Sequence, residues 1–139
     1  MGHHILKKLK REDGFSLPEL LIVLVIIGVL VMIAIPIYNN IATRAKMTEA
    51  RIMLNQVHSL QQAYYLEFDH YSDNLQRIGF EQNPLITEGG RARYIIEIES
   101  ADQLGYVATA TSIVDFNKSG RYNVWEIDAH GIPEQRITD

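Results

Sequence analysis

The chain has 139 residues, enough for one small domain and little more. It contains no cysteine, so no disulfide can stabilise the fold. Hydrophobic residues make up 47% of the chain, an ordinary share for a soluble protein, but they are concentrated near the N-terminal end. The average composition therefore hides two regions of different character.

The N-terminal region contains an uninterrupted apolar run. Residues 20–37 read LLIVLVIIGVLVMIAIPI, eighteen residues without a charge. A helix of that length spans about 27 Å, close to the ~30 Å hydrocarbon core of a bilayer. Four basic residues precede the run, at positions 7, 8, 10 and 11, and the next one is Arg44. This asymmetry predicts a single-pass membrane helix with its N-terminus in the cytoplasm.

The charge of the remaining chain argues against nucleic-acid binding. Residues 1–14 hold four basic and two acidic residues, and without them nine basic and 15 acidic residues remain, a net charge of −6. Nucleic-acid binding depends on clustered Lys and Arg, so we expect no nucleic-acid partner.

The start of the apolar run carries a specific pattern. A short basic leader, KKLKREDG, ends at Gly14, Phe15 opens the apolar segment, and Glu19 lies just inside it. This order resembles the class III signal peptide of type IV pilins and pseudopilins. The resemblance implies that a prepilin peptidase removes residues 1–14 and N-methylates Phe15. The matching positions are Gly14, Phe15, Leu17, Glu19, Leu20, Leu21, Gly28 and Pro36.

Glu19 needs a partner, because a carboxylate within the membrane costs about 2.5–3.5 kcal/mol on insertion scales. Cleavage after Gly14 would create one, the positive α-amino group of Phe15. Within one helix the carboxylate lies about one turn from that amine. In a stack of staggered helices it can instead meet the amine of a neighbour, and the family resemblance implies this second arrangement. We therefore assign assembly to Glu19 and Phe15.

Two residues weaken the apolar helix. Pro36 removes a backbone hydrogen bond at a cost of about 3 kcal/mol, and Gly28 adds a smaller propensity penalty of about 1 kcal/mol. Either a local kink or a loss of helix at Gly28 and Pro36 fits this pattern. In related pili the matching stretch loses helicity when the subunit enters the filament.

Beyond the apolar run the helical periodicity continues. Apolar residues recur at spacings of three and four from Ala50 to Phe68, with polar residues such as Gln56, Gln61 and Gln62 on the other sides. Three stretches near 94–98, 106–110 and 124–128 then alternate in the manner of strands. The sequence predicts an α+β fold, a long N-terminal α-helix packed on a three- to four-stranded antiparallel sheet, which resembles the type IV pilin fold.

The predicted organisation has five parts. Residues 1–14 form the leader peptide, 15–38 the transmembrane and assembly helix, and 39–68 its amphipathic continuation. Residues 69–93 form a loop, and 94–139 form the sheet and the C-terminal tail.

One motif is a candidate metal site. Asp115, Asn117, Ser119 and Glu126 fit the calcium-loop template D-x-N-x-S-G-x5-E. Helices flank such a loop in an EF-hand, whereas strand patterns flank it here, so the prediction is a polar hairpin turn without metal, with Gly120 at positive φ. Calcium binding is the alternative. The histidines, including His58, are too scattered for a metal site, and we expect them to be solvated.

The sequence shows no catalytic triad, P-loop or dinucleotide turn, so we expect no enzyme and no cofactor. The leading hypothesis is a structural pilin that polymerises into an extracellular type IV pilus through its N-terminal helix. Its expected partners are copies of itself, prepilin peptidase, an inner-membrane assembly machinery with an ATPase, and minor pilins. The precursor would reside in the bacterial inner membrane. The alternatives are a pseudopilin of a type II secretion system and, less favoured, a competence pilin that binds DNA.

Overall fold

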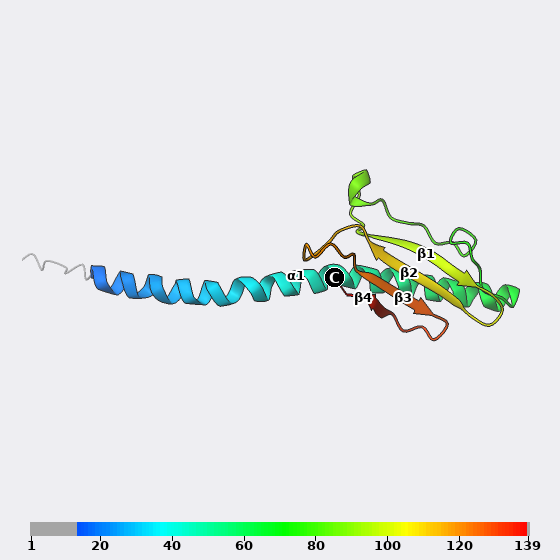
Figure 1. Ribbon diagram of the computed structural model, residues 1–139, viewed down its shortest axis with the longest axis horizontal. Helices are drawn as coiled ribbons and strands as arrows, with labels where there is room; N and C mark the ends of the chain where they lie inside the picture. Colours follow the sequence, from blue (N-terminus) through cyan, green and yellow to red (C-terminus); the bar gives the residue numbers. More distant parts are fainter. Residues whose placement is uncertain (1–13, 139) are drawn as a thin grey trace, which may run out of the picture. The chain divides into compact units, whose positions relative to one another are not determined.

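The computed structural model describes residues 14–138, and the predicted leader lies outside the described residues except for Gly14. A single helix, α1 (Leu17–Phe68), is followed by a short 3-10 turn, η1 (Ile86–Glu88). Four strands follow, β1 (Tyr94–Ala101), β2 (Tyr106–Ser112), β3 (Val124–Asp128) and β4 (Glu134–Ile137) (Figure 1). The chain forms two compact units that divide after Asn39, so α1 contributes to both.

The second half of α1 packs on the sheet through one face. Ala50, Met53, Leu54 and Val57 are buried at the predicted spacing of three and four. Gln61, which the sequence placed on a polar side of the helix, is fully buried instead. Its amide donates to the backbone oxygen of Ser72 at 2.7 Å and accepts from the backbone N–H of Ser72 at 3.0 Å. These two bonds provide partners for the buried backbone N–H and C=O groups of Ser72, which explains why a polar residue occupies a core position.

The sheet is antiparallel, with strand order β1-β2-β3-β4. Tyr94, Ile96 and Ile127 are buried in the core and alternate with exposed or half-buried residues, as the period of two predicts. In β2 the alternation is interrupted, because Thr109 is buried together with Ala108 and Ala110. The α+β architecture expected from the sequence is therefore confirmed. The sequence did not locate β4, whose four residues are all exposed and show no alternation.

The loop between α1 and β1 covers the free edge of the sheet. Gln82 accepts from the backbone N–H of Ile96 at 3.1 Å and donates to the backbone oxygen of Tyr94 at 3.0 Å. Its amide thus occupies the position that a fifth strand would take, which protects the edge from pairing with another chain. At the start of β1, Glu49 of α1 accepts from the backbone N–H of Arg93 at 2.7 Å.

Candidate assembly site

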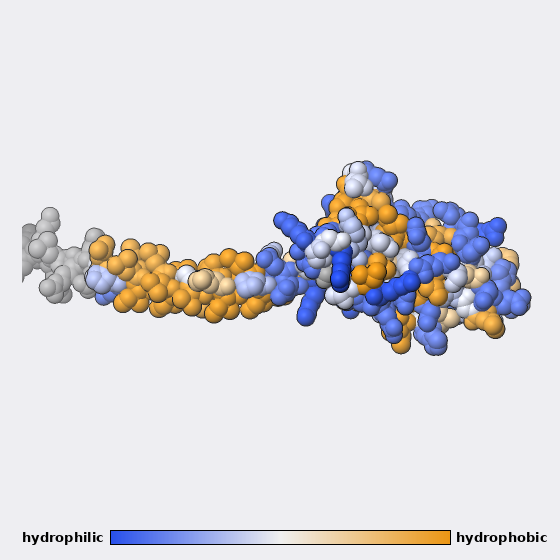
Figure 2. All heavy atoms as spheres, in the orientation of Figure 1, coloured by the Kyte–Doolittle hydropathy of each residue, from blue (hydrophilic) through white to orange (hydrophobic). Residues whose placement is uncertain are grey.

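The first half of α1 presents an uncovered apolar surface. Every large hydrophobic side chain from Leu17 to Ile37 is between 46% and 77% exposed. By length and composition α1 is able to cross a membrane, and the described residues contain one such helix. Figure 2 shows this apolar surface as a nearly continuous band along the segment. A surface of this size is unstable in water, so it requires a lipid bilayer or apolar partners.

Glu19 caps the start of α1. Its Oε2 accepts from the backbone N–H of Ser16 at 3.0 Å, and the oxygen of Ser16 accepts the first helical bond, from Leu20 at 3.1 Å. Ser16 is therefore the N-cap residue and Glu19 the third helical residue, the reciprocal half of a capping box. The negative charge is also favourable at the positive end of the helix dipole.

This partner differs from the one expected from the sequence. The expected partner is the positive amine that cleavage would create on Phe15, a residue that is 86% exposed. The S-x-x-E spacing of Ser16 and Glu19 is a capping signal that was visible in the sequence. The pairing of Glu19 with the Phe15 amine of a neighbour remains a prediction.

The two residues expected to weaken the helix both lie within α1. Pro36 is a helical residue of α1, and Gly28 lies eight residues before it. The helix continues on both sides of Pro36, from Leu17 to Phe68. Loss of helix at these positions on assembly remains a prediction.

The candidate calcium loop forms a tight turn, in which side chains of the turn accept hydrogen bonds from its own backbone. Asp115 accepts from the backbone N–H groups of Ser119 at 3.1 Å and Gly120 at 2.7 Å, and Asn117 accepts from Ser119 at 2.8 Å. Gly120 has the predicted positive φ, at 83°. The fourth template residue, Glu126, lies on β3 with an oxygen 3.6 Å from the Arg136 guanidinium. The side chains that would hold calcium thus have protein partners, and calcium binding stays a prediction to be tested.

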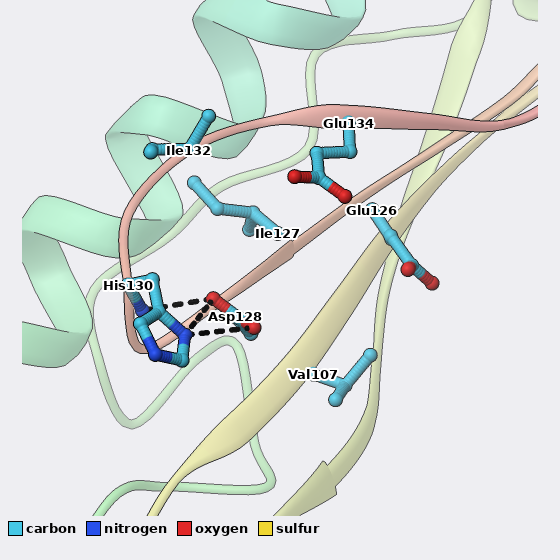
Figure 3. Close-up of a pocket in the computed structure, with 7 residues that line it drawn as sticks. All are labelled: Val107, Glu126, Ile127, Asp128, His130, Ile132 and Glu134. Carbon is cyan, nitrogen blue, oxygen red and sulfur yellow. Dashed lines mark hydrogen bonds and ion pairs between the residues drawn. The ribbon is translucent and has the colours of Figure 1, made fainter.

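Glu126 also borders a small acidic pocket of about 280 Å³. Figure 3 shows Glu126, Asp128 and Glu134 around it, with His130 turned toward Asp128. Hydrogen bonds from the backbone and the ring of His130 lower the pKa of Asp128. Among residues 14–138, no three His, Cys, Asp or Glu side chains gather as metal ligands.

His58 corrects one expectation. The sequence predicted a solvated side chain, but His58 is half-buried and its Nδ1 lies 2.6 Å from the hydroxyl of Tyr106. A Cβ at Gly131 would lie 2.5 Å from its Nε2, so the turn after β3 closes tightly over the ring. Burial raises the pKa of Tyr106, which keeps its hydroxyl protonated for this contact.

Comparison with known proteins agrees with these features. Residues 9–35 match the family model of the prokaryotic N-terminal methylation motif. The type IV major pilin protein PilA of Myxococcus xanthus is 37% identical, over 66% of this chain and 40% of that protein. The type IV major pilin protein PilE1 of Neisseria gonorrhoeae is 31% identical, over 73% of this chain and 58% of that protein. A fimbrial protein of Pseudomonas aeruginosa is 29% identical, over 73% of this chain and 70% of that protein.

The chain thus combines three features expected of a type IV pilin: the methylation motif, an exposed apolar helix, and a helix packed on an antiparallel sheet. These matches support the type IV pilin family, because two relatives named as type IV major pilins are 37% and 31% identical to this chain. It spans about half of the length of the first two relatives, 40% and 58%.

Proposed function

We propose that this chain is a structural subunit that polymerises into an extracellular type IV pilus. The observation that carries the proposal is the apolar first half of α1, because no residue of its most apolar eighteen-residue stretch is buried within the chain. Copies of the same helix can cover this surface once the subunit leaves the lipid. The names of the relatives, type IV major pilins and fimbrial proteins, favour a pilus over the secretion pseudopilin.

Processing would precede assembly. Prepilin peptidase would cleave after Gly14 and methylate the new N-terminus at Phe15, with the leader on the cytoplasmic side. The match to the methylation motif supports this step, since it covers the cleavage point. The processed subunit would then remain in the inner membrane, with its C-terminal unit outside the cytoplasm, until it is assembled.

Glu19 would set the stagger between neighbouring helices. Leu, Ile and Val surfaces adhere without a fixed register, because one apolar contact resembles the next. A single pair between Glu19 and the Phe15 amine of a neighbour fixes the register, since every other offset leaves two charges unmatched in a low dielectric. Before assembly the bond from Ser16 lowers the cost of holding the carboxylate in the membrane.

The role is architectural rather than catalytic. The partners would be further copies of the chain, minor pilins, prepilin peptidase and an inner-membrane machinery driven by an ATPase. The acidic charge of the chain after residue 14 gives no support to nucleic-acid binding, which disfavours the competence alternative. No cofactor is required by this function.

Substitutions at Glu19 test the proposal. Glu19→Val should enter the membrane and be processed, yet yield no homopolymeric filaments. Glu19→Gln is the matched control for capping, because its amide oxygen still accepts from Ser16 while the charge is gone. We expect Glu19→Gln to fail as well, and Glu19→Asp to be partly impaired. The measurement is sheared-filament yield against the membrane pool of processed subunit, and wild-type yield from Glu19→Gln would contradict a charge-based register.

A further inference from the structure

An apolar groove opens between α1 and the loop that precedes β1. Its volume is about 800 Å³, and its walls include Ala45, Ile52 and Met53 of α1 with Pro84 and Ala92 of the loop. Ile52 lies two residues after the buried Ala50, about 200° around the helix, so it points away from the sheet and is 62% exposed. The groove is therefore an open apolar surface within the C-terminal unit.

The other end of the same unit carries an apolar tip. Leu104 is 92% exposed on the turn between β1 and β2, and Leu66 and Phe68 are 85% and 49% exposed at the end of α1. Asp102 fixes this turn: its side chain accepts from the backbone N–H of Leu104 at 2.7 Å, and its backbone oxygen accepts from Tyr71 at 3.0 Å. The turn between β1 and β2, which carries Leu104, is thus held beside the end of α1 (Figure 1).

The two ends also have opposite charge. Around the groove, residues 44–51 and 88–93 contain five basic and two acidic residues. Around the tip, residues 66–77 and 101–105 contain four acidic residues and one arginine. All four acidic side chains of the tip are exposed, as is Arg91 on the groove wall. A tip brought to a groove would therefore bring opposite charges together.

We propose that the apolar tip of one subunit, centred on Leu104, docks into the groove of a second copy beside Ile52. The two surfaces differ and lie at opposite ends of one unit, so the contact is head-to-tail. A head-to-tail contact that does not close into a ring continues into an open filament. This inference rests on the proposed function and adds a second, head-based interface to the helix-based one.

Cysteine cross-linking tests the contact cleanly, because the native chain has no cysteine. The full-length double variant Ile52→Cys with Leu104→Cys should give a ladder of disulfide-linked dimers, trimers and longer species in oxidised, sheared filaments. The groove and tip of one subunit lie about 21 Å apart along α1, counted from Ile52 to Leu66, so a disulfide within one subunit is excluded. Each single variant should give dimers at most. The matched control is Ile52→Cys with Ile132→Cys, since Ile132 is 66% exposed but lies outside the tip.

A non-covalent variant gives a second readout. Leu104→Lys replaces the apolar side chain by a charge of the same sign as the groove at an already exposed position, so it should leave the processed membrane pool unchanged and lower filament yield about tenfold or more, as loss of an interface anchor does. Ile132→Lys should leave the yield unchanged. Filaments that show no Ile52–Leu104 ladder, an equal ladder from the Ile132 control, or full yield from Leu104→Lys would overturn this interface. Absence of filaments from the wild-type chain would instead overturn the proposed function.

Discussion

Replacing the buried Gln61 tests how the C-terminal unit is held together. In Gln61→Leu the side-chain size is roughly kept, but the N–H and C=O groups of Ser72, a residue only 3% exposed, both lose their partner. A buried polar group left without a partner costs about 1–3 kcal/mol, so the two together cost about 2–6 kcal/mol. Burial of the extra apolar surface offsets about 1–2 kcal/mol of this.

At the middle of these two ranges the net loss in the free energy of unfolding is about 2.5 kcal/mol, which corresponds to a fall of roughly 10 °C or more in the thermal midpoint of a domain this small. Circular dichroism of residues 40–139, expressed without the apolar segment, would measure it. The matched control is Gln56→Leu, an exposed glutamine of the same helix, which should change stability by less than about 0.5 kcal/mol. Equal midpoints for Gln61→Leu and wild type would refute the claim that this amide satisfies the buried loop.

Three further predictions concern the edge, the acidic pocket and the turn. Gln82→Ala should leave the edge of β1 unpaired and increase concentration-dependent association of residues 40–139, measured by light scattering. The bonds that lower the pKa of Asp128 stabilise the fold above pH ~4 and are lost as the pH falls through the lowered pKa, so the urea midpoints of wild type and Asp128→Asn should converge as the pH is lowered below that range. A chelator should leave the thermal midpoint unchanged, whereas a calcium-dependent rise abolished by Asp115→Ala would establish a metal site and revive the pseudopilin alternative.

The sequence predicted those elements that bury a regular face. The spacing of Ala50, Met53 and Val57 matches the helical period, and the alternation around Ile96 matches the strand period, because each must present one side to the core. It could not place β4, from Glu134 to Ile137, since an exposed edge strand has no apolar face to reveal it.

The two residues that were wrongly expected to face the solvent, Gln61 and His58, have a different explanation. Gln61 and His58 are polar residues on the inner part of α1, and their partners, Ser72 and Tyr106, are 11 and 48 residues away. Periodicity assigns polar residues to the solvent and contains no information about distant partners. The cap formed by Ser16 and Glu19 was local and therefore could have been predicted from its spacing.

The central claim is that the processed chain forms the filament. The most direct test is mass spectrometry of the N-terminal peptide from filaments sheared off cells that express the full chain. The account predicts that these filaments contain this chain beginning at N-methylated Phe15. Filaments that lack the chain, or a chain that retains residues 1–14 or begins after Ala34, would contradict it.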